Sequence, residues 1–137
     1  MLKNCDNTEF VWSLVQQLRK IKVDKNEVIY SIGEFSEEIY FIKQGKVKLY
    51  AQNGFPYLSC KDGEQFGDYE VIFNHPREGK AVAFSDCLFY TITKDDLDNQ
   101  LEQYEDMRFF IDSQAGKSRQ KHRKLQNEAM KINPIFN

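Results

Sequence analysis

The chain has 137 residues, of which 41% are hydrophobic, with 11 Phe and 7 Tyr, enough for one domain with a substantial core. No apolar run reaches the roughly 18–20 residues of a membrane span, and no signal peptide opens the chain. The net charge of −2 is unevenly distributed: residues 1–116 carry 13 basic and 20 acidic side chains, and residues 117–137 carry six basic and one acidic. The negative charge of residues 1–116 argues against nucleic-acid binding by that part of the chain.

The cysteines and histidines offer no obvious cross-link or metal site. The three cysteines are widely spaced without a Cys-x-x-Cys pair, and the two histidines lie far apart. This usage favours reduced, packing cysteines in a cytoplasmic domain and predicts no metal.

The first predicted element is a helix. Thr8 is placed to cap it, and apolar residues recur at helical spacing over the next turns, at Val11, Leu14, Val15 and Leu18.

Beyond Lys20, short apolar segments alternate with turn residues, which predicts β-strands. The predicted strands are 28–30, 39–42, 46–50, 57–60, 81–84 and 88–92. Gln44-Gly45 is expected to join strands 39–42 and 46–50 as a hairpin. Asn53-Gly54 is expected to join strands 46–50 and 57–60 in the same way. Such short strands and frequent turns predict an antiparallel barrel or roll.

Further helices are predicted within and after the strands. Residues 68–73 read as a short helix that interrupts the β pattern, and Thr93 to Asp96 form a capping box that opens another helix. A basic stretch, 117–131, follows, and Asn133-Pro134 is expected to end it. The predicted fold is therefore mainly β, a jelly-roll-like antiparallel β-roll with N-terminal and C-terminal helices.

Residues 65–79 combine groups that suit a sugar phosphate. Gly67 and Gly79 bracket the segment, Asp68 opens it and Arg77 closes it. The free N–H groups of a short helix and an arginine bind phosphate, and glycine lets the backbone approach the ligand. A carboxylate one ribose away accepts hydrogen bonds from a sugar hydroxyl.

The segment from Phe66 to Arg77 resembles the phosphate-binding cassette of cyclic-nucleotide-binding domains, whose pattern is Phe-Gly-Glu, a short helix, then Arg-Thr/Ala-Ala. Its length matches the cassette of cAMP-dependent kinase regulatory subunits without a gap. Residues 27–33 and 40–47 are similar to two strand motifs of the family, and Cys87 follows the arginine by ten residues, as in many members. The resemblance covers 1–115 and implies a regulatory domain, not an enzyme, that binds cAMP or cGMP.

The resemblance also implies residue roles. Arg77 pairs with the cyclic phosphate, Asp68 meets the ribose 2′-hydroxyl, and the backbones of Gly67 and Gly79 lie against the sugar phosphate. Leu58 and its strand form an apolar wall for the base.

Three further expectations concern the ends of the site. Phe66 opens the cassette and is expected in the core as well as in the ligand-binding set. A lid helix is expected to begin after Gly116, behind a hinge near Phe109–Phe110, and to close over the purine. Its contacts would be Arg119, Lys121 and His122. The domain thus divides into a roll with flanking helices, 1–116, and a lid helix with a loose tail, 117–137.

Three cassette residues depart from the family pattern. Asp68 replaces Glu and is one methylene shorter, Gly79 replaces Ala, and Glu78 stands where Thr, Ser or Ala is usual. A carboxylate beside a cyclic phosphate lowers affinity by like-charge repulsion, and Glu78 is also able to pair with Arg77.

The parent protein is expected to be larger. Gln103 to Asp106 with the following basic helix resembles the domain of a voltage-gated or cyclic-nucleotide-gated channel, of the potassium-selective type, tethered to a membrane by the parent. A cAMP-dependent kinase regulatory subunit is the second expectation. The C-terminal helix is a candidate contact for a homo-oligomer.

The sequence bears differently on three other function classes. A nucleotide-free interaction module of the same fold remains open, with the tail Ile135-Phe136 as a candidate occupant of the pocket. A transcription regulator needs a helix-turn-helix module, which the 21 residues beyond Gly116 cannot supply. An enzyme has no support, because no nucleophile–base pair or metal cluster is evident.

Overall fold

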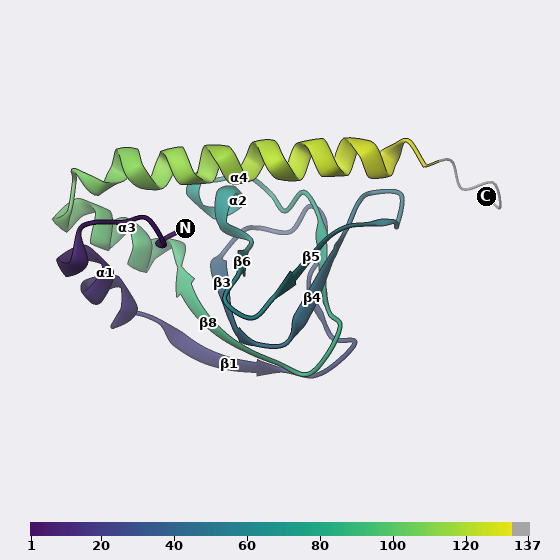
Figure 1. Cartoon of the computed structure of the whole chain (residues 1–137), viewed down its shortest axis with the longest axis horizontal. Helices are drawn as coiled ribbons and strands as arrows, with labels where there is room; N and C mark the ends of the chain where they lie inside the picture. Colours follow the sequence, from purple (N-terminus) through teal and green to yellow (C-terminus); the bar gives the residue numbers. More distant parts are fainter. Residues whose placement is uncertain (133–137) are drawn as a thin grey trace.

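Two four-stranded antiparallel sheets form the body of the molecule in the computed structural model, which describes residues 1–132 (Figure 1). One sheet has the order β1 (Arg19–Val23), β8 (Cys87–Thr93), β3 (Glu38–Gln44), β6 (Gln65–Phe66). The other has the order β2 (Val28–Tyr30), β7 (Lys80–Ala83), β4 (Lys46–Tyr50), β5 (Pro56–Lys61). The predicted β-roll with flanking helices is confirmed.

The turns differ in what they join. Asn53-Gly54 joins β4 to its partner β5, as predicted. The predicted hairpin at Gln44-Gly45 is wrong, because β3 and β4 belong to different sheets. Asp62 accepts a hydrogen bond from the backbone N–H of Gly45 at 2.7 Å and so holds the chain where it crosses between sheets. β7 and β8 are likewise split between the two sheets.

The sheets enclose one hydrophobic core, here called the roll core. Alternation in β4 buries Val47 and Leu49 while the residues between them stay more exposed, as period-two geometry requires. Tyr40 and Phe66 stack inside it with ring centroids 4.9 Å apart. The roll core comprises Val23, Tyr30, Tyr40, Ile42, Val47, Leu49, Cys60, Phe66, Ala81, Ala83, Cys87 and Phe89.

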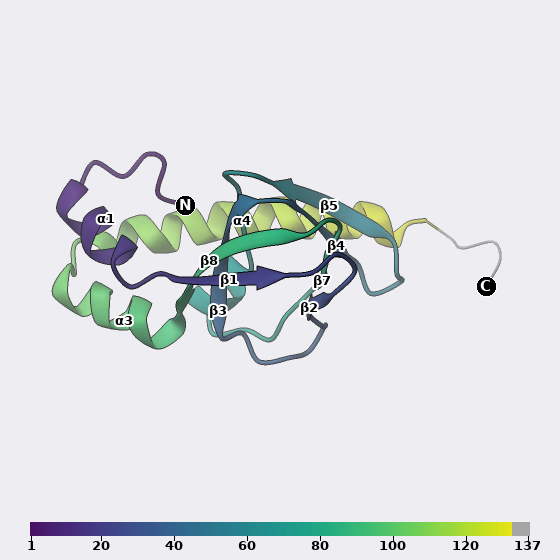
Figure 2. The ribbon, with the colours of Figure 1, turned by 90° about the horizontal axis from the view of Figure 1, so that it is seen from below.

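Helices at one end of the roll enclose a second core, here called the helix core. Helices α1 (Thr8–Val15) and α3 (Lys94–Gln103) lie beside each other beyond the strands (Figure 2). Their apolar faces meet β3 and β8 through Phe10, Leu14, Ile39, Ile92, Leu97 and Leu101, with Met1, Val71 and Ile111 completing the cluster. Both faces of β3 are therefore covered, which explains its continuous apolar run from Ile39 to Ile42.

Side chains mark where the shorter helices begin. Thr93 caps α3 by accepting a hydrogen bond from the N–H of Asp96 at 3.1 Å, as the capping box predicted. The predicted cap of α1 is wrong by one residue: Asn7 accepts from the N–H of Phe10 at 3.0 Å, and Thr8 is the first helical residue. The predicted short helix is α2 (Asp68–Ile72).

Helix α4 (Met107–Met130) has 24 residues and runs along one side of the molecule, over α2 and β5 (Figure 1). The prediction that the lid helix starts after Gly116 is wrong, because α4 begins at Met107. The predicted hinge residues are Phe109 and Phe110. Both phenylalanines lie in the first turn of one uninterrupted helix, and the burial of Ile111 and Ala115 fixes that part against the domain. Asn133-Pro134 and Ile135-Phe136 lie outside the described residues.

Within residues 1–132, no helix is both long and apolar enough to cross a lipid bilayer.

Candidate functional site

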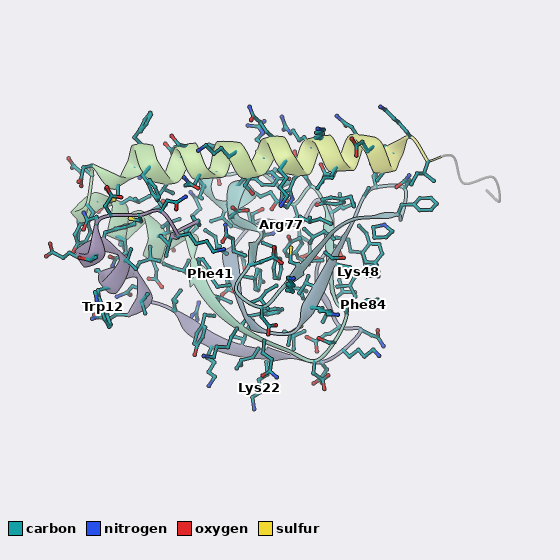
Figure 3. The ribbon with its side chains drawn as sticks, in the orientation of Figure 1. Trp12, Lys22, Phe41, Lys48, Arg77 and Phe84 are labelled. Carbon is teal, nitrogen blue, oxygen red and sulfur yellow. The ribbon has the colours of Figure 1, made fainter. Side chains whose placement is uncertain are left out.

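Arg77 is the centre of the candidate site and is only 3% exposed. It follows α2 in the chain, and Figure 3 places it below α4 among the strands of the roll. Its Nη1 donates to the carbonyl of Gly67 at 2.8 Å and its Nη2 to the carbonyl of Glu38 at 2.6 Å. The guanidinium carbon also lies 4.1 Å from the centre of the Tyr30 ring. The sequence therefore folds its key cation into the interior rather than onto the surface.

The ionic partner of Arg77 is Glu70, a residue of α2 that is also only 3% exposed. Oε1 of Glu70 accepts from Arg77 Nη1 at 3.1 Å, and Oε2 accepts from the backbone N–H of Glu78 at 2.8 Å. Burial raises the pKa of the Glu70 carboxyl, and the N–H of Glu78 and the Arg77 guanidinium oppose that rise. A side-chain donor and a backbone donor thus converge on one carboxylate, which is the arrangement of an anion site.

One donor of this site has no partner. Among residues 1–132, Nε of Arg77 is one of two buried side-chain polar atoms without a hydrogen bond; the other is Oγ1 of Thr91. A buried N–H without an acceptor costs free energy, so the site has unused capacity for an oxyanion. This observation fits a phosphate group, which presents more acceptor oxygens than one carboxylate.

Gly67 joins β6 to α2 at a position that requires glycine. It is the N-cap of α2 with φ of +73°, in the left-handed region. A Cβ there would lie 2.8 Å from Nη1 of Arg77. The bare backbone therefore lets the guanidinium reach the Gly67 carbonyl.

Asp68, expected to meet the ribose, is only 2% exposed and accepts a hydrogen bond from Ser118 of α4 at 3.0 Å. The residue predicted to read the sugar is therefore in contact with the helix predicted to cover the ligand.

Glu78 does not pair with Arg77, and that expectation is wrong because its side chain turns toward α4. Its Oε1 accepts from the Tyr69 hydroxyl at 2.8 Å, and its Oε2 accepts from Arg123 at 3.2 Å. Burial opposes ionisation of Glu78, but these hydrogen bonds outweigh it and lower the pKa of the carboxyl below its ordinary value. The Glu78 carbonyl also accepts from Gln126 at 3.3 Å.

A pocket of about 470 Å³ lies between β5, the N-terminal segment and α4. Arg77 and Glu70 do not line it, and its link to their cluster is Ser118, which lines the pocket and donates to Asp68. Leu58, Lys121 and His122 also line the pocket, three residues that the sequence predicted around the base. His122 is 6% exposed, and its ring meets the Tyr57 and Tyr69 rings edge-on at 5.9 and 5.2 Å. Burial lowers the pKa of His122.

The remaining predicted residues lie elsewhere. Phe66 is a residue of the roll core. Arg119 lies on α4 with its guanidinium carbon 5.6 Å from the centre of the Phe73 ring, along a separate hollow. Gly79 is buried against Tyr57, whose hydroxyl takes the space of a Cβ. The structure thus gathers Gly67, Asp68, Arg77 and Glu78, and leaves Phe66 and Arg119 outside that group.

The contributing side chains that were not predicted are Tyr30, Tyr57, Tyr69, Glu70, Ser118, Arg123 and Gln126. The sequence held a signal for Glu70, because α2 carries two acids and the ribose role accounts for one of them. Nothing in the local pattern distinguished Ser118 or Arg123 from other polar residues of α4.

A family of known proteins matches the part of the chain that holds Arg77 and Glu70. Residues 20–104, more than half of the chain, match the model described as "Cyclic nucleotide-binding domain". The chain belongs to the cyclic nucleotide-binding domain family, a family of regulatory domains.

Individual relatives come from two kinds of protein. The chain is 27% identical over 82 residues, 60% of its length, to a cAMP-dependent protein kinase regulatory subunit of Yarrowia lipolytica. It is 31% identical over 74 residues, 54% of its length, to the corresponding subunit of Debaryomyces hansenii. It is 24% identical over 127 residues, 86% of its length, to the cyclic nucleotide-gated channel cone photoreceptor subunit alpha of Gallus gallus. The chain spans 22%, 16% and 17% of these relatives, respectively.

Proposed function

We propose that this domain is a sensor for cAMP or cGMP within a larger regulatory protein. The observation that carries the proposal is the buried anion site, where the Arg77 guanidinium and the N–H of Glu78 converge while Nε of Arg77 has no hydrogen-bond partner among residues 1–132. The cyclic phosphate would bind these donors.

The neighbouring residues fit the rest of the nucleotide. Asp68 directly follows Gly67, whose carbonyl accepts a hydrogen bond from Arg77, and its carboxylate would accept from the ribose 2′-hydroxyl. The pocket lined by Leu58, Lys121 and His122 supplies an apolar wall and polar groups for the base.

The output runs through α4. Asp68 and Glu78 hold this helix through Ser118 and Arg123, so a nucleotide that reorders the two carboxylates changes the energy of the docked helix. This is a population shift, and its size is limited by the difference in nucleotide affinity between the two helix positions.

We propose a channel as the parent protein, with the domain on the cytoplasmic side of the membrane. The match to the channel subunit extends over 86% of the chain, against 60% and 54% for the two kinase subunits. In such a parent, the basic surface of α4 is available for contacts between copies of the domain.

The test is calorimetric titration of the domain with cAMP and with cGMP. Wild type is expected to bind one nucleotide, and Arg77→Lys, which keeps the charge and loses the two-nitrogen geometry, is expected to bind at least about tenfold more weakly. Arg108→Lys, a substitution at an exposed arginine of the same chain, is the matched control and is expected to bind like wild type.

A nucleotide-free interaction module is the second candidate, favoured by the Glu70 carboxylate, which already engages both donor groups. Absence of heat and of any thermal shift at millimolar nucleotide would overturn the sensor and leave this candidate.

A further inference from the structure

Glu70 engages the same two groups that the proposed function assigns to the cyclic phosphate. Its carboxylate oxygens lie 3.1 Å from Nη1 of Arg77 and 2.8 Å from the backbone nitrogen of Glu78. Two anions cannot share these donors at hydrogen-bonding distance without strong repulsion in a buried site. A nucleotide must therefore displace the Glu70 carboxylate or bind against the repulsion of its negative charge.

The surroundings add to the cost of a second anion. Asp68 lies two residues before Glu70 on α2, and both are buried. Glu78 contributes a third carboxylate, which Arg123 partly neutralises at 3.2 Å. Arg77 is the cation closest to Glu70, so a phosphate would compete for a charge that is already balanced.

Among the hydrogen-bond partners of Arg77 in residues 1–132, only the Glu70 side chain carries a negative charge. The other partners of Arg77 are the carbonyls of Gly67 and Glu38, which are uncharged and bind Nη1 and Nη2. They hold the guanidinium in place without repelling a phosphate. Arg77 thus keeps backbone anchors when Glu70 releases it.

We propose that Glu70 is an internal ligand of the anion site and sets the nucleotide affinity of the domain. The inference rests on the proposed function and deepens it: the carboxylate holds Arg77 and the N–H of Glu78 until a cyclic phosphate replaces it. Glu70 then lowers the affinity for nucleotide and raises the nucleotide concentration at which the sensor responds.

The test compares wild type with Glu70→Gln and Glu70→Ala by titration with cAMP and cGMP. Glu70→Gln keeps the side-chain volume and an acceptor while it removes the charge, and Glu70→Ala removes the competitor altogether. Both are expected to bind nucleotide at least tenfold more tightly than wild type. Glu102→Gln, at an exposed acid of α3, is the matched control and is expected to leave affinity unchanged. Thermal unfolding of each variant checks that it is folded.

A second readout follows the donors themselves. In ¹H–¹⁵N spectra of wild type, nucleotide is expected to shift the signal of the Glu78 amide, which exchanges Glu70 for the phosphate as its acceptor. The signal of Arg77 Nε–H, the unpartnered N–H of the same guanidinium, is expected to shift with it.

The outcomes separate this inference from the proposed function. Wild-type binding that is equal to or tighter than that of Glu70→Gln overturns the role of Glu70 and leaves the sensor standing, as does nucleotide binding without movement of the two signals. Binding by the Glu70 variants alone supports the role of Glu70 and overturns the sensor for the native chain. No binding by any variant overturns both.

Discussion

The Ser118 hydroxyl donates a hydrogen bond to the Asp68 carboxylate at 3.0 Å, which joins the middle of α4 to the first residue of α2. The two residues are 50 positions apart, and Asp68 is almost fully buried. A buried carboxylate needs such a partner, because its desolvation is otherwise uncompensated. The position of α4 and the state of the proposed ribose carboxylate are therefore coupled by one short contact.

Ser118→Ala should weaken the docking of α4. The substitution leaves Asp68 buried with one hydrogen bond fewer, at an expected cost of about 1–3 kcal/mol in the free energy of unfolding. Urea unfolding gives the global effect, and hydrogen exchange of α4 amides gives the local one. Ser113→Ala, on the same helix, is the control; a loss equal to that of Ser118→Ala would contradict the role of the contact.

Removal of Arg77 should destabilise the domain far more than removal of an exposed arginine. Arg77→Met leaves Glu70 as an unpaired buried charge and is expected to cost about 3–5 kcal/mol in unfolding free energy. Arg19 pairs with Glu38 at 3.3 Å with its side chain 62% exposed, so Arg19→Met is expected to cost no more than about 1 kcal/mol.

The same pair should show strong coupling in a double-mutant cycle. Glu70→Leu with Arg77→Met removes both charges together, so its loss of stability is expected to be smaller than the sum of the two single losses. Additive losses, measured by urea unfolding, would show that the ion pair is not the reason for the cost.

Stability should depend on pH through His122. Burial lowers its pKa, while Asp68 and Glu78 favour its charged form and Lys121 opposes it. The rings of Tyr57 and Tyr69 complete its surroundings. The unfolded chain therefore takes up the proton first, so this contribution to stability is complete above pH 6.5 and is lost as pH falls below it.

His122→Phe keeps the packing ring and removes the titration. Its unfolding free energy is expected to fall less than that of wild type between pH 7.5 and pH 5, measured by urea unfolding at each pH. A His122→Phe profile that follows wild type would refute the assignment.

Gly79→Ala should destabilise although alanine is usual at this family position. The new Cβ would overlap the Tyr57 hydroxyl, and overpacking of this kind costs about 1–3 kcal/mol. Tyr57→Phe in the same chain is expected to recover part of the loss in melting temperature. Gly116→Ala, where a Cβ meets nothing within 4 Å and the backbone is helical, is expected to stabilise instead.

Six of the eight strands in residues 1–132 were predictable from local pattern, but β1, β6 and the pairing of the strands were not. Asn53-Gly54 and Gln44-Gly45 both end one strand and begin another, and only the first closes a hairpin. A tight turn and a crossing between facing sheets need similar turn residues. The difference lies in distant groups such as Asp62, which fixes Gly45 from 17 positions away.

Some residues of the candidate site were likewise predictable from the sequence, and others were not. The resemblance of Phe66 to Arg77 to the family's phosphate-binding cassette predicted that Gly67, Asp68 and Arg77 meet. Glu70 escaped prediction because an acid near a helix N-terminus is also typical of an exposed residue. The role of Glu70 comes from its burial beside Arg77 in the folded structure, and the spacing of apolar and polar residues along the chain does not predict that burial. The direction of the Glu78 side chain depends likewise on Arg123, 45 residues later.

The strand that receives Arg77 also links the two cores. The carbonyl of Glu38 at the start of β3 accepts from Arg77, the next residue, Ile39, is buried in the helix core, and Tyr40 is buried in the roll core. Neither core can open without breaking the packing of this strand. The domain is therefore expected to unfold as one cooperative unit, in which α1 and α3 share their stability with the residues that hold the anion.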